Sequence, residues 1–148
     1  MYYNEAMKER EVTTRGEYLL RLERGEDVLP TISEFCKRKG ILSGSFRAIG
    51  AVERAKIGFY NLAEKKYGDI VYPEAREVTS MTGNIAQVDG VPFVHAHAVL
   101  TDMVKNECIG GHVFEAKVAV TLEVHLVAFN ENIARKMDGT IELKLLDL

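Results

Sequence analysis

Three of the four histidines lie within residues 92–114, and these histidines are the side chains best suited to chemistry. His95 and His97 are two positions apart in the apolar run 94–100, which contains no Pro or Gly. This run is typical of a buried β-strand, and residues two apart on a strand point to the same face. Two imidazoles side by side on a rigid strand form a pair of candidate metal ligands.

The third histidine, His112, follows the dipeptide Gly110-Gly111. Such a dipeptide allows a tight turn and a close approach to another segment. A loop that returns His112 over the strand would bring three neutral imidazoles to one point. Three protein ligands with an open fourth position are typical of catalytic zinc sites, whereas structural sites are usually closed by four. The sequence therefore predicts that His95, His97 and His112 bind Zn²⁺ or another divalent transition metal.

The alternative is that His95 and His97 are core histidines, hydrogen-bonded to backbone carbonyls or to acids. Burying two imidazoles without partners costs on the order of a few kcal/mol, so each ring needs a partner in either interpretation. The spacing favours metal binding by the three histidines together more than by either pair alone.

The chain has the size of one compact domain, residues 1–148, with residues 1–14 expected to be a loose start or an edge element. No apolar run is long enough to span a bilayer, and the N-terminus lacks a signal-peptide pattern. The two cysteines, Cys36 and Cys108, are too few for a disulfide scaffold, so a reducing cytoplasm is expected. The net charge of −3 argues against a generic phosphate-binding surface.

One helix is predicted. Residues 28–39 carry apolar side chains at helical spacing, with Asp27 as the expected N-cap and Gly40 as the residue that ends the helix. Cys36 belongs to the apolar stripe, and we expect it to pack in the core.

Strands are expected over most of the remaining chain, because alternating or β-branched runs are separated by turn residues. The predicted strands are 16–23, 51–61, 67–72, 77–88, 94–100, 116–129 and 140–148, with a polar break over 130–139. Hairpin-type turns link them, so the sequence predicts an α+β fold with a mainly antiparallel sheet of about seven strands and one main helix.

One hairpin has a specific turn signal. Asp89-Gly90 is flanked by strand-like residues, and it predicts antiparallel pairing of 77–88 with the histidine strand. Gly83, inside the first of these strands, indicates a bulge or a close backbone approach.

Three further residues are candidates for the site. Glu123 and His125 should share one face of 116–129, opposite Val118, Val120, Leu122, Val124 and Leu126. Glu123 could orient a ligating histidine, act as a general base on a metal-bound water, or pair across a subunit interface, and a structural or interface role is favoured. His125 is expected as its neighbour and not as a ligand. Cys108 is a candidate extra ligand, although a surface or packing role is favoured.

Several short motifs occur in a specific order: Ala48–Val52 (AIGAV), Ile57–Tyr60 (IGFY), Met81–Asn84 (MTGN), His95-Ala96-His97 and Gly110-Gly111-His112. In this order and spacing the chain resembles the plants and prokaryotes conserved domain, the PPC domain, over nearly its full length. The resemblance implies an α+β fold that assembles as a homotrimer. It also implies a zinc-type metal at His95, His97 and His112, as in the prokaryotic members that carry these histidines.

The resemblance also implies DNA as a partner, because plant members join this domain to AT-hook motifs and act in transcription. The sequence contains no Arg-Gly-Arg-Pro core, so the element with which those proteins enter the minor groove is missing. Conversely, the histidines that plant members generally lack are all present.

Three functions follow as hypotheses. The first is a homotrimeric metal-binding domain whose open site binds or transforms a small anionic or carbonyl ligand, in the catalytic case as a zinc-dependent hydrolase or lyase. No nucleophile motif, phosphate loop or cofactor fingerprint accompanies the histidines, so the reaction class stays open. The second is a DNA-binding or transcription-related module without catalysis, and the third is an assembly scaffold with a purely structural metal. For DNA contact, the residues to test are Arg47, Arg54, Lys56, Lys65 and Lys66.

Overall fold

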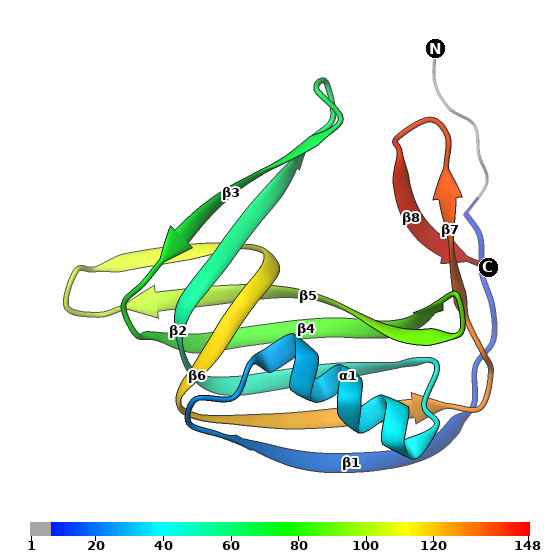
Figure 1. Ribbon diagram of the computed structural model, residues 1–148, viewed down its shortest axis with the longest axis horizontal. Coiled ribbons are helices and arrows are strands. Elements are labelled where there is room, and N and C mark those ends of the chain that lie inside the picture. Colours follow the sequence, from blue (N-terminus) through cyan, green and yellow to red (C-terminus); the bar gives the residue numbers. More distant parts are fainter. Residues whose placement is uncertain (1–6) are drawn as a thin grey trace.

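The computed structural model describes residues 7–148, which form one eight-stranded sheet and a single α-helix (Figure 1). In chain order the elements are β1 (Thr14–Glu23), α1 (Val28–Lys39), β2 (Gly44–Asn61), β3 (Lys66–Tyr72), β4 (Arg76–Val88), β5 (Val91–Asp102), β6 (Glu107–Phe129), β7 (Ala134–Asp138) and β8 (Leu143–Asp147). One helix on a mainly antiparallel sheet is confirmed. A single parallel pair, Gln87 with Ala134, makes the sheet mixed. Residues 7–13 have no regular structure, Thr14 already begins β1, and residues 1–6 of the predicted loose start lie outside the described residues.

The central strand pairings close on themselves. The sheet order is β3-β2-β6-β5-β4-β7-β8, with β1 paired to β6 and an additional pairing between β2 and β4. Strands β2, β4, β5 and β6 therefore form a closed ring, in which each strand is hydrogen-bonded to two others of the set. The long strand β6 serves several partners in succession, and its first residues, Glu107–His112, pair with β5.

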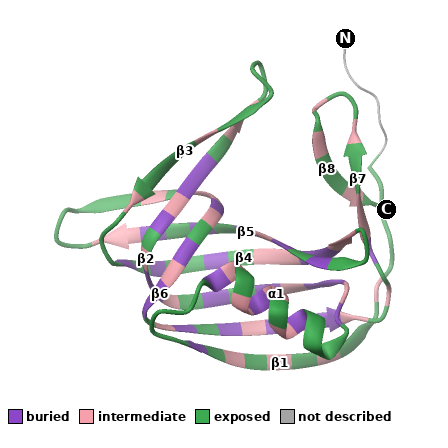
Figure 2. Cartoon of the chain, in the orientation of Figure 1, coloured by how far each residue is buried: buried purple, intermediate pink, exposed green. Residues whose placement is uncertain are grey.

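Helix α1 covers one face of the sheet and packs against β5 and β6 (Figure 1). Its buried residues are Val28, Ile32 and Cys36, as predicted, and burial raises the pKa of the Cys36 thiol to about 11. Gly40 ends the helix in the left-handed conformation, with φ of 63°. Along the strands, buried and exposed residues alternate, so the sheet has one face towards the core and one outer face (Figure 2). No helix within residues 7–148 has the length and apolar character needed to cross a membrane.

Asp27 occupies the predicted N-cap position, but its side chain makes no capping hydrogen bond. Its carboxylate instead lies 3.0 Å from the Lys117 ammonium on β6. The predicted N-cap position is therefore confirmed, and the ion pair ties the start of the helix to the sheet.

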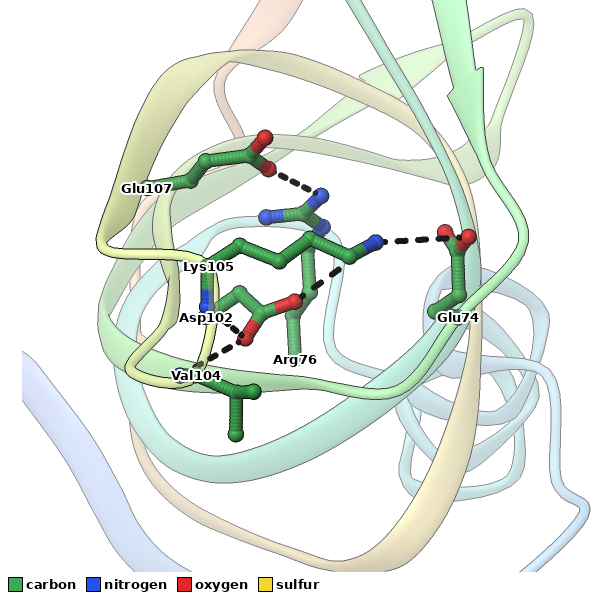
Figure 3. A network of polar contacts seen from close by, with 6 residues as sticks. All are labelled: Glu74, Arg76, Asp102, Val104, Lys105 and Glu107. Carbon is green, nitrogen blue, oxygen red and sulfur yellow. Dashed lines mark hydrogen bonds and ion pairs between the residues drawn. The ribbon is translucent and has the colours of Figure 1, made fainter.

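The predicted glycine turn before His112 is also wrong, because Gly110 and Gly111 lie inside β6. The chain turns at residues 103–106 instead. Asp102 Oδ1 accepts hydrogen bonds from the backbone N–H groups of Val104 (3.0 Å) and Lys105 (3.1 Å), and Asn106 adopts a φ of 52°. Figure 3 shows the surrounding ion pairs, Arg76 with Glu107 and Lys105 with Glu74, which fix this turn over the sheet. The close approach to another segment that was predicted for these glycines is confirmed, since a Cβ on Gly111 would lie 2.6 Å from the Gly58 carbonyl oxygen.

Two other strand predictions need correction. The polar break over 130–139 contains β7, which forms a hairpin with β8, and Asp138 closes its turn by accepting hydrogen bonds from Thr140 and Ile141 N–H. Val120 was expected on the same face as Val118 and Leu122, which are buried, but it is 68% exposed. The β2–β6 register shifts between Gly50 and Val52, and this irregularity turns Val120 outwards.

Gly83 is the point of closest approach between β4 and its neighbours. A Cβ there would lie 2.3 Å from Phe46 Cε1 and 2.5 Å from the His95 carbonyl oxygen. The close approach predicted for this glycine is confirmed, whereas the bulge in β4 lies at Val78/Ser80.

The substitution Gly83→Ala should therefore destabilise the fold. The added methyl group meets a backbone carbonyl that cannot move without disturbing the β4–β5 ladder, so we expect a loss of about 1–3 kcal/mol in the free energy of unfolding. Gly139→Ala is the matched control, because its Cβ would meet no atom within 4 Å. Urea denaturation of both variants measures the difference, and equal stability of the two would contradict this account.

Candidate metal centre

The alternation of β5 separates its histidines from the core. Val94, Ala96 and Ala98 are buried, so His95 and His97 share one face, as predicted, and this face is the outer face of the sheet. The β5–β6 register then places His112 directly opposite His97. Backbone pairing of two strands, and not a returning loop, is what brings the third histidine to the other two.

The three imidazoles converge. One ring nitrogen from each of His95, His97 and His112 can be chosen so that all three lie within 4.8 Å of one another, and the ring centroids are 5.0–5.5 Å apart. Three nitrogens around a tetrahedral zinc at about 2.0–2.1 Å lie roughly 3.3 Å apart, so small ring rotations would close the remaining gap.

The cluster also contains an unsatisfied atom. His112 Nδ1 is buried and has no hydrogen-bond partner. Such an atom costs on the order of 1–3 kcal/mol in an otherwise satisfied fold. A metal ion bound by the three rings would need only small ring rotations. It would give the cluster a binding partner that the protein itself does not supply. The donor set, three neutral nitrogens, suits zinc and related transition metals.

The electrostatic environment keeps two of the rings neutral. Burial, then the Arg135 charge and the other two histidines, lowers the pKa of His95 from 6.5 to about 4. Burial, then His97 and Arg135, also lowers the pKa of His112. Neutral imidazole is the form that binds a metal, so both rings are held in the ligand state at neutral pH.

Aromatic side chains line the site beside His112. The Tyr67 ring from β3 lies 5.1 Å from the His112 ring, and the Phe114 ring lies 4.6 Å from it, measured between centroids. Gly58 makes room for this packing, because a Cβ there would lie 2.4 Å from Phe114 Cε2.

Arg135 from β7 completes the surroundings of His95. Its Nη2 donates to Asn84 Oδ1 at 2.6 Å and lies 3.3 Å from His95 Nδ1. Its Nη1 donates to the Lys144 carbonyl oxygen at 2.9 Å. Arg135 was not predicted as a site residue, because 130–139 was expected to be a polar break. Residues 133–137, Ile-Ala-Arg-Lys-Met, show no strand-like alternation, so the sequence carried no local signal for it.

The other predicted candidates lie elsewhere. Glu123 and His125 share one face of β6, as expected, but they line a cavity of about 570 Å³ with residues of β1, β2 and β4. His125 Nε2 lies 2.9 Å from Glu17 Oε2 on β1. His95 and His97 line a separate cavity of about 320 Å³ with Thr82, Gly83 and Asn84.

Cys108 is exposed and pairs with Thr101 on β5. Four strand positions separate it from His112, or about 13 Å of extended chain. Within one chain, therefore, Cys108 and His112 cannot bind the same ion.

Residues 9–130 match the family model of the Plants and Prokaryotes Conserved (PCC) domain. A comparison with curated proteins gave no match. Among solved structures, the chain is similar to a metal-containing protein of Archaeoglobus fulgidus, with 37% identity, a TM-score of 0.87 and coverage of 94% of this chain and 98% of that one. It is also similar to a PPC protein of Pyrococcus horikoshii, with 33% identity, a TM-score of 0.88 and coverage of 96% and 98%.

A third similar structure is a Bacteroides thetaiotaomicron protein described as a candidate DNA-binding protein, with 26% identity, a TM-score of 0.84 and coverage of 92% and 96%. The family match ends before the β7–β8 hairpin, whereas these structural matches cover at least 92% of the chain. The fold, the ordered motifs and the matched residues agree, and this chain belongs to the Plants and Prokaryotes Conserved domain family.

Proposed function

We propose that this protein binds one divalent transition metal of the zinc type through His95, His97 and His112. The observation that carries the proposal is the convergence of three ring nitrogens within 4.8 Å, from two strands whose register is fixed by backbone pairing. The similarity to the Archaeoglobus protein, which is named as metal-containing, supports it.

The site is proposed to be open. Among the described residues, the group that could hold an ion contains three histidines and no carboxylate or thiol. Three protein ligands leave a position for water or for a small ligand, which favours ligand binding over a purely structural metal. When bound, zinc acts as a Lewis acid and lowers the pKa of bound water towards ~7. Glu123, the weak candidate for a proton-transferring group, lines the other cavity. Binding is therefore better supported than a hydrolase or lyase activity that uses Glu123.

We also propose that the outer face around Glu123 contacts further copies of this chain in a homotrimer. Leu19 and Ile49 are 86% and 59% exposed and line the larger cavity together with Arg21, Arg47 and Glu123. Exposed apolar side chains interleaved with charges of both signs are typical of a protein interface, and the family resemblance implies a trimer.

DNA binding is the second candidate, because two similar structures are described as candidate DNA-binding proteins. Of the five cations named for a test of DNA contact, Lys56 lies 3.6 Å from Asp69 and Lys65 lies 2.7 Å from Glu142. These two ammonium groups already have carboxylate partners, and the net charge is −3. We therefore rank metal binding first.

The metal proposal predicts that His97→Ala abolishes stoichiometric metal binding, because two imidazoles alone hold a transition metal weakly. His125→Ala is the matched control, since His125 is paired with Glu17 away from the cluster. Elemental analysis of the purified wild type and both variants tests the prediction. Wild-type protein without metal after loading, or equal metal content in His97→Ala, would refute the proposal.

The metal-free protein should lose stability between about pH 6.5 and about pH 4. In this window unfolded His95 takes up a proton and folded His95, with a pKa of about 4, does not, so the free energy of unfolding falls as the pH falls. The substitution His95→Asn should make this decline shallower. Urea denaturation in the presence of a chelator measures it, and identical pH slopes for His95→Asn and wild type would disagree with the assignment.

The interface proposal predicts that Ile49→Glu converts the trimer into smaller species. Ile49 pairs with Glu123 in the β2–β6 register, so the new carboxylate would add like charge to the centre of the proposed interface. Leu62→Glu is the control, because Leu62 is also exposed but lies in the turn after β2. Sedimentation velocity measures the assembly, and a monomeric wild type would rule out this assignment.

A further inference from the structure

Arg135 reaches the histidine cluster from the C-terminal hairpin. Two contacts hold this hairpin against the β2–β3 hairpin: Lys65 lies 2.7 Å from Glu142, and the Tyr60 hydroxyl donates to the Ile141 carbonyl oxygen. The Arg135 guanidinium is therefore a positioned group and not a freely moving surface charge. Its Nε is buried and has no hydrogen-bond partner, so part of its donor capacity is unused.

The contact between Arg135 and His95 cannot coexist with a metal on His95. Arg135 Nη2 lies 3.3 Å from His95 Nδ1, and this contact is a hydrogen bond only if Nδ1 presents a lone pair. If Nδ1 binds the metal, its lone pair is taken. If Nε2 binds the metal, neutral His95 carries its proton on Nδ1. Two donors, Nδ1–H and the Arg135 N–H, would then face each other. In either case metal binding releases one N–H of Arg135 at the edge of the site.

The charge of the loaded site calls for an anion. Three neutral imidazoles leave the 2+ charge of the ion uncompensated, and Arg135 adds another positive charge. The charged groups that influence His95 and His112 are Arg135 and the other histidines, with no acid among them. A ligand that places one oxygen on the ion, at about 2.0–2.2 Å, and another on Arg135, at about 2.7–2.9 Å, would satisfy both.

Aromatic side chains form walls beside His112 and Arg135, next to the cavity that Thr82, Gly83, Asn84, His95 and His97 line. The Arg135 guanidinium carbon lies 5.4 Å from the Phe93 ring centroid, and the Tyr67 and Phe114 rings lie beside His112. Inorganic anions gain nothing from such walls, whereas an organic anion buries its apolar part against them.

We propose that the metal site binds a small organic carboxylate, with one carboxylate oxygen on the ion and the other accepting from Arg135. The inference rests on the proposed metal binding, and it adds that metal and carboxylate bind with positive coupling. Arg135 is a binding residue in this scheme, because its planar guanidinium matches the two oxygens of a carboxylate.

The experiment uses the full chain loaded with Co²⁺, whose visible spectrum responds to a change in coordination, after metal content has been measured. Benzoate, acetate and inorganic phosphate are titrated into the wild type, Arg135→Gln, Arg135→Lys and Lys136→Gln. Lys136 is the matched control, because it is the exposed neighbouring cation on β7. Calorimetric titration of benzoate into the metal-free wild type tests the coupling.

We expect benzoate to shift the spectrum of the loaded wild type and to bind more tightly than acetate or phosphate. Arg135→Gln should keep its metal but weaken benzoate at least about 10-fold, Arg135→Lys should restore part of the loss, and Lys136→Gln should match the wild type. Equal benzoate affinity in Arg135→Gln and wild type, equal affinity in the metal-free protein, or a preference for phosphate would overturn the inference. A wild type that takes up no metal would overturn the proposed function as well, so the two failures are distinguishable.

Discussion

The backbone register of the β5–β6 hairpin is the constraint on which the site depends. His97 lies opposite His112 because the two strands pair in register from Asp102/Glu107 onwards, and the turn between them is closed by the Asp102 side chain. A slip of one residue would send His112 to the core side of the sheet. The ion pairs around the turn, shown in Figure 3, oppose such a slip, so they position the histidines without touching them.

The proposed interface and the proposed metal site lie on the same outer face of the sheet. Thr82 lines both cavities, and its neighbours Ser80 and Met81 face the larger one, whereas Gly83 and Asn84 face the smaller one. Strand β4 therefore forms the boundary between the two cavities. If another subunit fills the larger cavity, assembly also determines how much solvent reaches the histidines. The interface role favoured for Glu123 would then affect the proposed metal site beside it.

Much of the fold could be predicted from the sequence, because local signals determine much of it. Apolar spacing predicted α1 with its ends at Val28 and Lys39, and Asp89-Gly90 predicted the β4–β5 hairpin. The shared face of His95 and His97 followed from the period of a strand. The glycines before His112 were misinterpreted, because a glycine needed for close strand packing and a glycine needed for a turn look alike in one sequence. Val120 was placed on the wrong face because a register shift leaves no local trace in the sequence. Arg135 was missed because its contact with His95 is long-range.

The C-terminal hairpin carries Arg135 but lies beyond residues 9–130, the part of the chain that defines the family. The proposed ion ligands and the proposed ligand-selecting group are thus encoded by separate segments. Exchanging or redesigning this terminal hairpin would therefore change the proposed ligand preference while leaving the three histidines in place.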